Sequence, residues 1–331
     1  MSPARVTVVI PTFNRASSLR MAIESVLAQT YTDFTLVVAD NASTDETPEV
    51  VARYEDDRLT YLRRPENAGL FENFQSSLRD VRTEYALIVC DDDLLRPGYL
   101  EAAADVLDRE PRAGLVHTSF DVIDRDGHVV EHAADWTHGL TADTVESPAE
   151  FLAESMRWGC RVCSSAALMR TAALRPSLFE EEDMPALDFG LWLRLALDWD
   201  VAYLSRPLAA YRIHGEAESA GLGVPLAAGY QTGVEWVDLR ARVKERFLDE
   251  HGRRLPDAER LRRIARRGRR YELVAMARKA TLPERRPLAT LRSLARAARA
   301  DPAVAADPEA WRLAAASMLG PRLVERLRGR A

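Results

Sequence analysis

The sequence predicts an α/β fold: a mainly parallel sheet with helices on both faces, followed by a helical C-terminal region. Three observations support this prediction. Strand-like and helix-like segments alternate over the first hundred residues, which is typical of parallel sheets. Polar clusters at 11–15, 40–45 and 91–93 each follow a strand-like segment, and ligands bind beyond the carboxyl ends of such strands. Beyond residue 226 the chain is rich in Ala, Arg and Leu, which favour helices.

The alternating segments have lengths and periodicities that fit their types. Apolar runs of strand length occur at 6–10, 34–39, 59–62 and 85–90. The first helix has an apolar face that includes Leu19, Ile23 and Val26, and we expect Ser17 or Ser18 to cap it. Further helices are expected at 46–54, after the turn 41–45, and at 70–81.

The next hundred residues continue this domain with a less regular pattern. Strands are expected at 115–117, 121–123, 164–170 and 201–204, with a turn at 124–127 and a helix at 189–197. The polar stretch 128–147 is expected to form a loop or lid. Glycines and Pro225 mark 215–229 as a linker, so we expect one domain at 1–220 and a helical region at 226–331.

Charge is distributed unevenly between these two regions. Residues 1–225 hold 38 acidic residues and 20 arginines with no lysine, a net charge of −18, whereas residues 226–331 hold 13 acidic and 25 basic residues, a net charge of +12. Such asymmetry indicates two functional regions. Seven arginines are closely spaced in the basic region: Arg260, Arg262, Arg263, Arg266, Arg267, Arg269 and Arg270. They are expected either to pack on the acidic domain or to meet anionic lipid. Nucleic acid is disfavoured because aromatic residues are nearly absent among them.

Several features favour a cytoplasmic protein. No apolar stretch approaches the roughly 20 residues that span a bilayer, and the strand-like segment at 5–10 leaves no room for a signal peptide. Three cysteines, an odd number, fit a reducing compartment. Cys160 and Cys163 have a redox or metal spacing, but no second pair completes a zinc site, and we interpret them as small buried thiols. Membrane association on the cytoplasmic face is expected if the basic region binds lipid.

Three consecutive carboxylates, Asp91, Asp92 and Asp93, end the fourth strand-like run. Like charges at this spacing repel one another unless a cation lies between them. Hard divalent cations such as Mg²⁺ and Mn²⁺ prefer oxygen ligands. The sequence therefore predicts a divalent metal site.

The loop after the first strand carries residue types that suit a nucleotide. Phe13 could stack on a base, Thr12 offers a hydroxyl, and Arg15 could meet phosphate, although such loops also occur for structural reasons. Asp40 could accept a hydrogen bond from a base imide N–H, or it could cap its turn through Asn41. Both interpretations of Asp40 remain open at this point.

Taken together, several ordered segments resemble the family 2 glycosyltransferases, the inverting group with the GT-A fold. The resemblance covers residues 6 to about 219. It rests on the order and spacing of the segments 9–15 (Val-Ile-Pro-Thr-Phe-Asn-Arg), 25–31, 38–47, 67–69, 91–93, 187–194 and 211–214. It implies a GT-A catalytic domain at 1–220, with the nucleotide-sugar site in 1–97 and the acceptor side at about 98–220.

The resemblance also implies a role for each matching position. The nucleotide-sugar site would be formed by Pro11, Thr12, Phe13, Arg15, Asp40, Asn67, Gly69 and Asp91. The metal would be held by Asp92, Asp93 and His214, and Asp92 is the residue we favour as a direct metal ligand. Cys90 stands where many relatives have Asp, so metal binding falls to the triplet itself.

Asp188 matches the acidic residue that serves the family as general base, although Leu187 replaces the Glu that usually precedes it. The acidic run 180–183 is interpreted as a solvated loop that could supply the base instead. In inverting transfer an acceptor hydroxyl attacks the anomeric carbon directly, so a carboxylate must take its proton. A bound Mn²⁺ or Mg²⁺ neutralises the leaving diphosphate.

The resemblance thus implies transfer from a nucleoside diphosphate sugar, with UDP favoured, to a saccharide, lipid-linked or small-molecule hydroxyl. A sugar-phosphate nucleotidyltransferase would want a Gly-rich loop with lysine near the first strand, and this chain has no lysine before Lys244. A catalytically inactive nucleotide-binding or scaffolding protein is disfavoured by the presence of Asp92 and Asp188. A dinucleotide-dependent oxidoreductase is disfavoured because no G-x-G-x-x-G follows the first strand.

Overall fold

The computed structural model describes residues 4–132, 139–174, 179–213, 234–279 and 287–319. The chain divides into two compact units. Unit 1 comprises Met1–Ser155 and Cys160–His214, and unit 2 comprises Met156–Gly159 and Gly215–Ala331. The linker expected at 215–229 lies outside the described residues.

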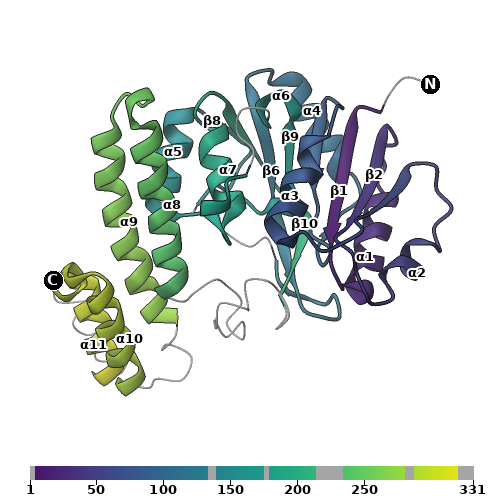
Figure 1. Ribbon diagram of the computed structural model, residues 1–331. Coiled ribbons are helices and arrows are strands. Elements are labelled where there is room, and N and C mark those ends of the chain that lie inside the picture. The colour runs from purple at the N-terminus through teal and green to yellow at the C-terminus, as the bar shows by residue number, and fades with distance from the viewer. Residues whose placement is uncertain (1–3, 133–138, 175–178, 214–233, 280–286, 320–331) are drawn as a thin grey trace. The chain divides into compact units, whose positions relative to one another are not determined.

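Unit 1 is built around one largely parallel sheet (Figure 1). Its strands are β1 (Val6–Thr12), β2 (Phe34–Asp40), β3 (Leu59–Arg63), β4 (Tyr85–Ile88), β5 (Leu94–Leu95), β6 (Ala113–Ile123), β7 (Val129–Glu131), β8 (Thr144–Glu146), β9 (Ala167–Arg170) and β10 (Asp200–Arg212). They pair in the order β3-β2-β1-β4-β9-β6-β10-β5, with β7 on β6 and β8 on β10. The strands β1–β4, β6 and β10 share one direction, and the others run against it. The predicted fold class is confirmed.

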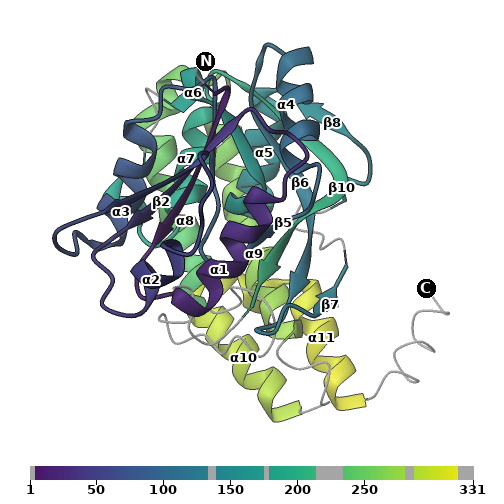
Figure 2. The same ribbon diagram turned by 90° about the vertical axis from the view of Figure 1, so that its right-hand side faces the viewer.

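Helices cover both faces of this sheet (Figure 2). They are α1 (Ala16–Leu27), α2 (Thr47–Val51), α3 (Gly69–Arg79), α4 (Tyr99–Arg109), α5 (Pro148–Trp158), α6 (Thr171–Leu174) and α7 (Leu187–Leu195), with short 3₁₀ turns η1 (Ser164–Ala166) and η2 (Glu181–Asp183). The chain moves outward from β1 to β3 and then returns to β4 on the other side of β1. Right-handed crossovers then place α1 and α2 on one face and α3 on the other.

The start of α1 differs from the prediction. The helix begins at Ala16, ahead of Ser17 and Ser18, and its N-cap Arg15 makes no side-chain capping bond. The backbone N–H of Ala16 instead donates to Asp45 Oδ2 at 3.0 Å. A carboxylate from the loop after β2 therefore satisfies the N-terminal donor that the serines were expected to satisfy.

Three segments in the second half of unit 1 also differ. The segments 115–117 and 121–123 form one strand, β6, because parallel pairing with β10 continues along its length through several irregularities in register. The same pairing extends the strand predicted at 201–204 to the whole of β10. The stretch 128–147, expected as a loop or lid, contains β7 and β8, and residues 133–138 lie outside the described residues.

Unit 2 is helical in its described parts. Its elements are α8 (Val234–His251), η5 (Gly252–Arg254), α9 (Ala258–Lys279), α10 (Pro287–Ala300), η6 (Pro302–Ala306) and α11 (Pro308–Leu319). The helices α8 and α9 lie side by side (Figure 1). A cluster of buried apolar residues that includes Val237, Leu273 and Leu294 forms the core between its helices. Among the described helices, none combines the length and apolarity that crossing a membrane requires.

Candidate functional site

The polar clusters that follow β1, β2 and β4 meet at one edge of the sheet. Thr12 pairs with Asp40 at the ends of β1 and β2, and the Thr12 hydroxyl donates to Asp91 Oδ2 at 2.7 Å. The Asn14 backbone N–H donates to Ser43 Oγ at 2.9 Å. The predicted convergence of 11–15, 40–45 and 91–93 is therefore confirmed, because parallel strands bring their carboxyl ends to the same edge.

The acidic triplet carries charge that the protein does not fully neutralise. Burial and the neighbouring charge of Asp92 raise the pKa of Asp91 to about 7, although the Thr12 hydroxyl, the Arg15 charge and the Phe13 N–H all act to lower it. Asp93 is 2% exposed, and burial together with Asp92 raises its pKa well above its usual range. Carboxylates with raised pKa values at a shared site are those that an added cation would stabilise.

The donor set at this edge suits a divalent cation. Cys90 Sγ and carboxylate oxygens of Asp92 and Asp93 lie within 4.8 Å of one another. The carboxylates are the oxygen ligands that Mg²⁺ and Mn²⁺ prefer, and the thiol adds a softer donor. Of the three expected ligands, Asp92 and Asp93 are described and have the chemistry that fits the expected metal. His214, the third expected ligand, lies outside the described residues.

Arg212, to which the sequence pattern assigned no role, fixes the triplet loop. Its side chain is buried, its Nε donates to the Asp92 carbonyl at 2.7 Å, and its backbone N–H donates to Asp93 Oδ1 at 2.9 Å. Its Nη1 also donates to the carbonyls of Asp124 and Arg125, each at 2.8 Å. Arg212 thus ties the triplet to the turn after β6. The family-like segment 211–214 was the signal that could have identified it.

Asp40 is committed to its own turn. Its side chain is fully buried, and its Oδ1 accepts the Ser43 backbone N–H at 2.9 Å and the Ser43 hydroxyl at 2.5 Å. Its Oδ2 accepts the Tyr61 hydroxyl at 2.5 Å. The capping interpretation was right in kind but wrong in its partner, because Asn41 donates its backbone N–H to the Thr12 carbonyl at 2.9 Å instead.

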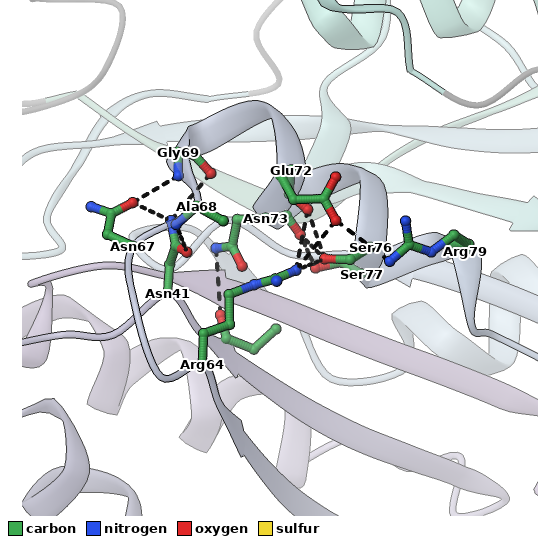
Figure 3. Close-up of polar contacts among 11 residues, drawn as sticks. Asn41, Arg64, Asn67, Ala68, Gly69, Glu72, Asn73, Ser76, Ser77 and Arg79 are labelled. Atoms are coloured by element: carbon green, nitrogen blue, oxygen red, sulfur yellow. Dashed lines mark hydrogen bonds and ion pairs between the residues drawn. The ribbon is translucent and has the colours of Figure 1, made fainter.

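Asn67 and Gly69 shape a loop beside that turn (Figure 3). Asn67 Oδ1 accepts hydrogen bonds from Asn41 Nδ2 and from the Gly69 N–H, both at 2.8 Å. Asn41 Oδ1 in turn accepts the Ala68 N–H at 3.0 Å. Gly69 has φ +85°, and a Cβ added there would meet no other atom within 4 Å, so glycine is required for backbone conformation rather than for close approach. The expected contact of this loop with a nucleotide stays a prediction.

The remaining residues expected at the nucleotide differ in exposure. Pro11 is buried within β1 opposite Ala39. Phe13 is 40% exposed and so offers an accessible ring beside Thr12. Arg15, half-buried at the start of α1, is close enough to Asp91 for its charge to lower that residue's pKa.

Asp188 lies in the first turn of α7 and is held by both oxygens. Ser164 Oγ donates to its Oδ2 at 2.9 Å, and the Phe189 N–H donates to its Oδ1 at 2.7 Å. Burial raises the pKa of Asp188 even though these two hydrogen bonds act to lower it. A half-buried carboxylate with a raised pKa is a better proton acceptor than an exposed one.

The acidic run 180–183 is only partly solvated. Glu181 and Glu182 are exposed, as expected. Asp183 is fully buried, however, and pairs with Arg194 Nη1 at 2.7 Å. A Cβ on Gly190 would lie 1.7 Å from Asp183 Oδ2, so this pair packs against the bare backbone of α7. The solvated interpretation is therefore wrong for Asp183, which is committed to structure.

The cysteines at 160 and 163 are free thiols. Cys163 is buried, as expected, whereas Cys160 is half-buried and its Sγ lies 3.4 Å from the Val162 carbonyl.

The chain matches a known family and several proteins within it. Residues 7–173 match the family model described as glycosyl transferase family 2. An uncharacterized glycosyltransferase of Rickettsia prowazekii (strain Madrid E) is 24% identical over 210 residues, which are 63% of this chain and 64% of that protein. The chain thus spans less than two thirds of that relative. Glycosyltransferase GlyA of Streptococcus pneumoniae serotype 4 is 31% identical over 99 residues, 29% of this chain and 14% of that protein.

Two solved structures share the fold. Residues 1–349 of S. aureus TarS, in complex with UDP-GlcNAc, superpose with a TM-score of 0.61 at 19% identity, covering 98% of this chain and 92% of that one. The mannosyltransferase PcManGT from Pyrobaculum calidifontis, in complex with GDP-Man and Mn²⁺, gives a TM-score of 0.56 at 21% identity, covering 98% and 83%.

Proposed function

This chain belongs to glycosyl transferase family 2 and has the GT-A fold of its structural neighbours, and on that premise we propose that it is a metal-dependent inverting glycosyltransferase. It would move a sugar from a nucleoside diphosphate sugar to an acceptor hydroxyl. The observation that carries the proposal is the hydrogen bond from Thr12, at the end of β1, to Asp91. This contact joins the loop suited to a nucleotide to the acids suited to a metal.

The donor would lie across the ends of β1, β2 and β4. Phe13 would stack on the base, Arg15 would meet phosphate, and Asp91 would accept a hydrogen bond from the ribose. Asp40 and the loop that contains Asn67 and Gly69 would flank the base. We favour UDP as the nucleotide, and GDP is the main alternative because one structural neighbour was solved with UDP-GlcNAc and another with GDP-Man.

The residues divide the chemistry between two ends of the site. Asp92 and Asp93 would hold a divalent metal, which when bound would offset negative charge on the leaving diphosphate. Asp188 would take the proton of the acceptor hydroxyl as that oxygen bonds to the anomeric carbon and the bond to the diphosphate breaks. Asp188 must be ionised to act, so activity should fall as pH falls through its raised pKa.

A thermal-shift panel tests donor binding. UDP, dTDP, GDP and CDP are each added with and without Mn²⁺, and we expect one of them to raise the Tm more with Mn²⁺ than without it. Asp92→Asn should reduce the Mn²⁺-dependent part. If no nucleotide stabilises the protein in a metal-dependent way, the proposal fails.

Asp188→Asn tests the base. We expect transfer to fall by about 10²- to 10⁴-fold, since the proton acceptor is removed, while nucleotide affinity stays nearly unchanged. Glu182→Gln, an exposed acid in the neighbouring run, is the matched control and should leave transfer unchanged. Retained transfer in Asp188→Asn would move the role to the acids at 180–182.

We further propose that the basic helix α9 contacts an anionic membrane surface at the cytoplasmic face, which would suit a lipid-linked acceptor. Arg262 and Arg269 pair within unit 2, each at 2.7 Å, with Asp249 and Asp238. By contrast Arg260, Arg263, Arg266 and Arg267 are exposed, and basic surfaces of this kind attract anionic lipid.

Vesicle sedimentation tests this contact. Binding to phosphatidylserine vesicles should weaken with salt and in the triple variant Arg260→Glu, Arg263→Glu, Arg267→Glu. Reversal of the arginines Arg79, Arg82 and Arg109 of unit 1, all exposed, is the control for net charge. The membrane proposal fails if both variants lose binding equally, or if the wild-type protein itself does not bind the vesicles.

A further inference from the structure

Two adjacent serines bridge the two ends of the candidate site. Ser164 and Ser165 are the first two residues of the 3₁₀ turn η1, which directly precedes β9. The Ser164 hydroxyl donates to Asp188 Oδ2 at 2.9 Å. The Ser165 hydroxyl donates to Asp93 Oδ2 at 2.6 Å and accepts the Cys90 backbone N–H at 2.9 Å. One turn therefore touches both the proposed base and the acidic loop.

We propose that Ser164 and Ser165 are positioning residues with separate tasks: Ser164 orients Asp188 for proton abstraction, and Ser165 orients the acidic loop for metal binding. This inference rests on the proposed function, because it assigns the serines to the base and to the metal-binding loop of the same site.

The two carboxylates are held by the same arrangement of donors. Asp188 has one oxygen on the Phe189 backbone N–H and the other on Ser164. Asp93 has one oxygen on the Arg212 backbone N–H and the other on Ser165. A backbone donor and a hydroxyl on opposite oxygens fix the plane of a carboxylate. Each serine therefore supplies the half of the restraint that the local backbone does not.

The turn is rigid enough to transmit this restraint. Ser165 is 1% exposed, and its neighbours Cys163, Ala166 and Ala167 are buried. The Ala166 N–H donates to the Cys163 carbonyl at 2.9 Å, which closes the turn. β9 then enters the sheet between β4 and β6, so η1 is anchored to the strand that leads into the triplet. Residues on such elements are placed more precisely than residues on free loops.

Loss of the Ser164 hydroxyl should alter the ionisation of Asp188. Among the described residues, the charge of Asp183 raises the pKa of Asp188, and Asp188 in turn raises the pKa of the Cys163 thiol. Neither Asp183 nor Cys163 changes in Ser164→Ala. The lost hydrogen bond favoured the ionised form, so the acidic limb of the pH profile should move to higher pH.

The experiment compares Ser164→Ala, Ser164→Thr and Ser165→Ala in the full-length chain. It measures kcat/KM against pH, and Mn²⁺ affinity by calorimetry in the presence of the nucleotide that binds best. For Ser164→Ala we expect about a 10- to 100-fold loss of kcat, an acidic limb at higher pH and an unchanged Mn²⁺ Kd. Ser164→Thr keeps the hydroxyl and should restore both kcat and the position of the acidic limb. For Ser165→Ala we expect an about 10- to 100-fold weaker Mn²⁺ Kd with an unmoved acidic limb.

The outcomes separate this inference from the proposed function. If the wild type transfers sugar and binds Mn²⁺ but both serine variants alter the same parameter, or neither alters any, the division of tasks is wrong and the proposed function stands. If the wild type shows neither transfer nor metal-dependent nucleotide binding, the proposed function fails first. Ser165→Cys, which keeps a weak donor of similar size, replaces Ser165→Ala if that variant does not fold, and the same weakening of Mn²⁺ binding is expected.

Discussion

A buried carboxylate of unit 2, Glu272, and two carboxylates of the triplet in unit 1, Asp91 and Asp93, have opposite electrostatic environments. In unit 2, the Glu272 side chain is 9% exposed and accepts hydrogen bonds from Arg240 Nε at 2.8 Å and Lys244 Nζ at 3.1 Å. Burial opposes its ionisation, but the charges of Lys244 and Arg240 and their hydrogen bonds outweigh burial, so the pKa of Glu272 is lowered. In unit 1, burial and the charge of Asp92 raise the pKa values of Asp91 and Asp93.

The difference indicates which acids serve structure and which serve binding. Glu272 brings its own cations, so its folded environment is already complete. The donors on Asp91 and Asp93 that hold them in place include hydroxyl and backbone N–H groups, from Thr12, Ser165 and Arg212. These hydrogen bonds fix the direction of the carboxylates, and the charges of Arg15 and Arg212 lower the two pKa values without outweighing burial and the charge of Asp92. Such a site gains most from a cation that arrives from outside, which is what perturbed groups at functional sites commonly show.

The largest effect on stability is expected when Glu272 is removed from its two cationic partners. Glu272→Ala would leave Arg240 and Lys244 buried without their shared partner, and removal of one member of a buried ion pair costs about 3–5 kcal/mol. Urea denaturation followed by circular dichroism measures the loss. Glu259→Ala, on the same helix but exposed, should change stability by no more than about 0.5 kcal/mol. Equal effects of the two variants would mean that Glu272 is not the buried partner described here.

A change in stability of the opposite sign is expected when Asp91, in the triplet, is replaced. Asp91 has a folded-state pKa of about 7, above its value of about 3.9 in an unfolded chain. The folded state therefore binds the proton more tightly, and the protein loses stability as pH rises from about 4 to about 7. Asp91→Asn cannot ionise, and with chelator present it should be more stable than the wild type at pH 8, by up to about 4 kcal/mol. At pH 4 the gain should disappear.

Asp108 provides a control in which the expected change in stability has the other sign. Its hydrogen bond with Arg5 lowers its pKa, and partial burial, which acts to raise the pKa, does not outweigh this effect. Asp108→Asn should therefore destabilise the protein near neutral pH. Thermal melts of both variants across pH 4–8 give the comparison. A gain for Asp91→Asn that does not depend on pH would show that the repulsion assigned to the triplet is absent.

The sequence predicted the parts of the site that local patterns encode. Alternating segments placed Thr12, Asp40 and Asp91 at the ends of strands, and parallel strands have one common carboxyl edge. The roles of Ser165 and Arg212 could not be read in this way. Their partners are 72 and 119 residues distant along the chain, and only the antiparallel β9 and the long β10 bring them to the triplet.

Asp183 shows the same limit in a second form. A run of four acids has the composition of a solvated loop, and for Glu181 and Glu182 that interpretation was correct. Its last member is buried because Arg194 and the bare backbone at Gly190 lie further along α7 and pack against it. Burial of a charge depends on a partner, and single-residue patterns do not identify partners.

The smallest effect on stability is expected in the turn that holds Asp40. Asp40 is intermediate between Glu272 and the triplet. It is fully buried, with the Ser43 and Tyr61 hydroxyls as donors and Arg63 Nε at 3.4 Å. The turn that delivers Ser43 to Asp40 contains Ala42 at φ +64°, a left-handed conformation that costs an L-residue about 1–2 kcal/mol. Ala42→Gly should relieve this strain, and after the larger loss of backbone entropy by glycine it should stabilise unit 1 by about 0.5–1 kcal/mol.

Ala102→Gly, within α4, is the matched control and should destabilise the protein by about 1 kcal/mol. Thermal melts of both variants measure the difference in sign. If Ala42→Gly destabilises as much as Ala102→Gly, the turn is not strained. The hydrogen bonds of Asp40 would then support its burial without any cost in backbone strain. In that respect Asp40 would be more similar to Glu272 than to the carboxylates of the triplet.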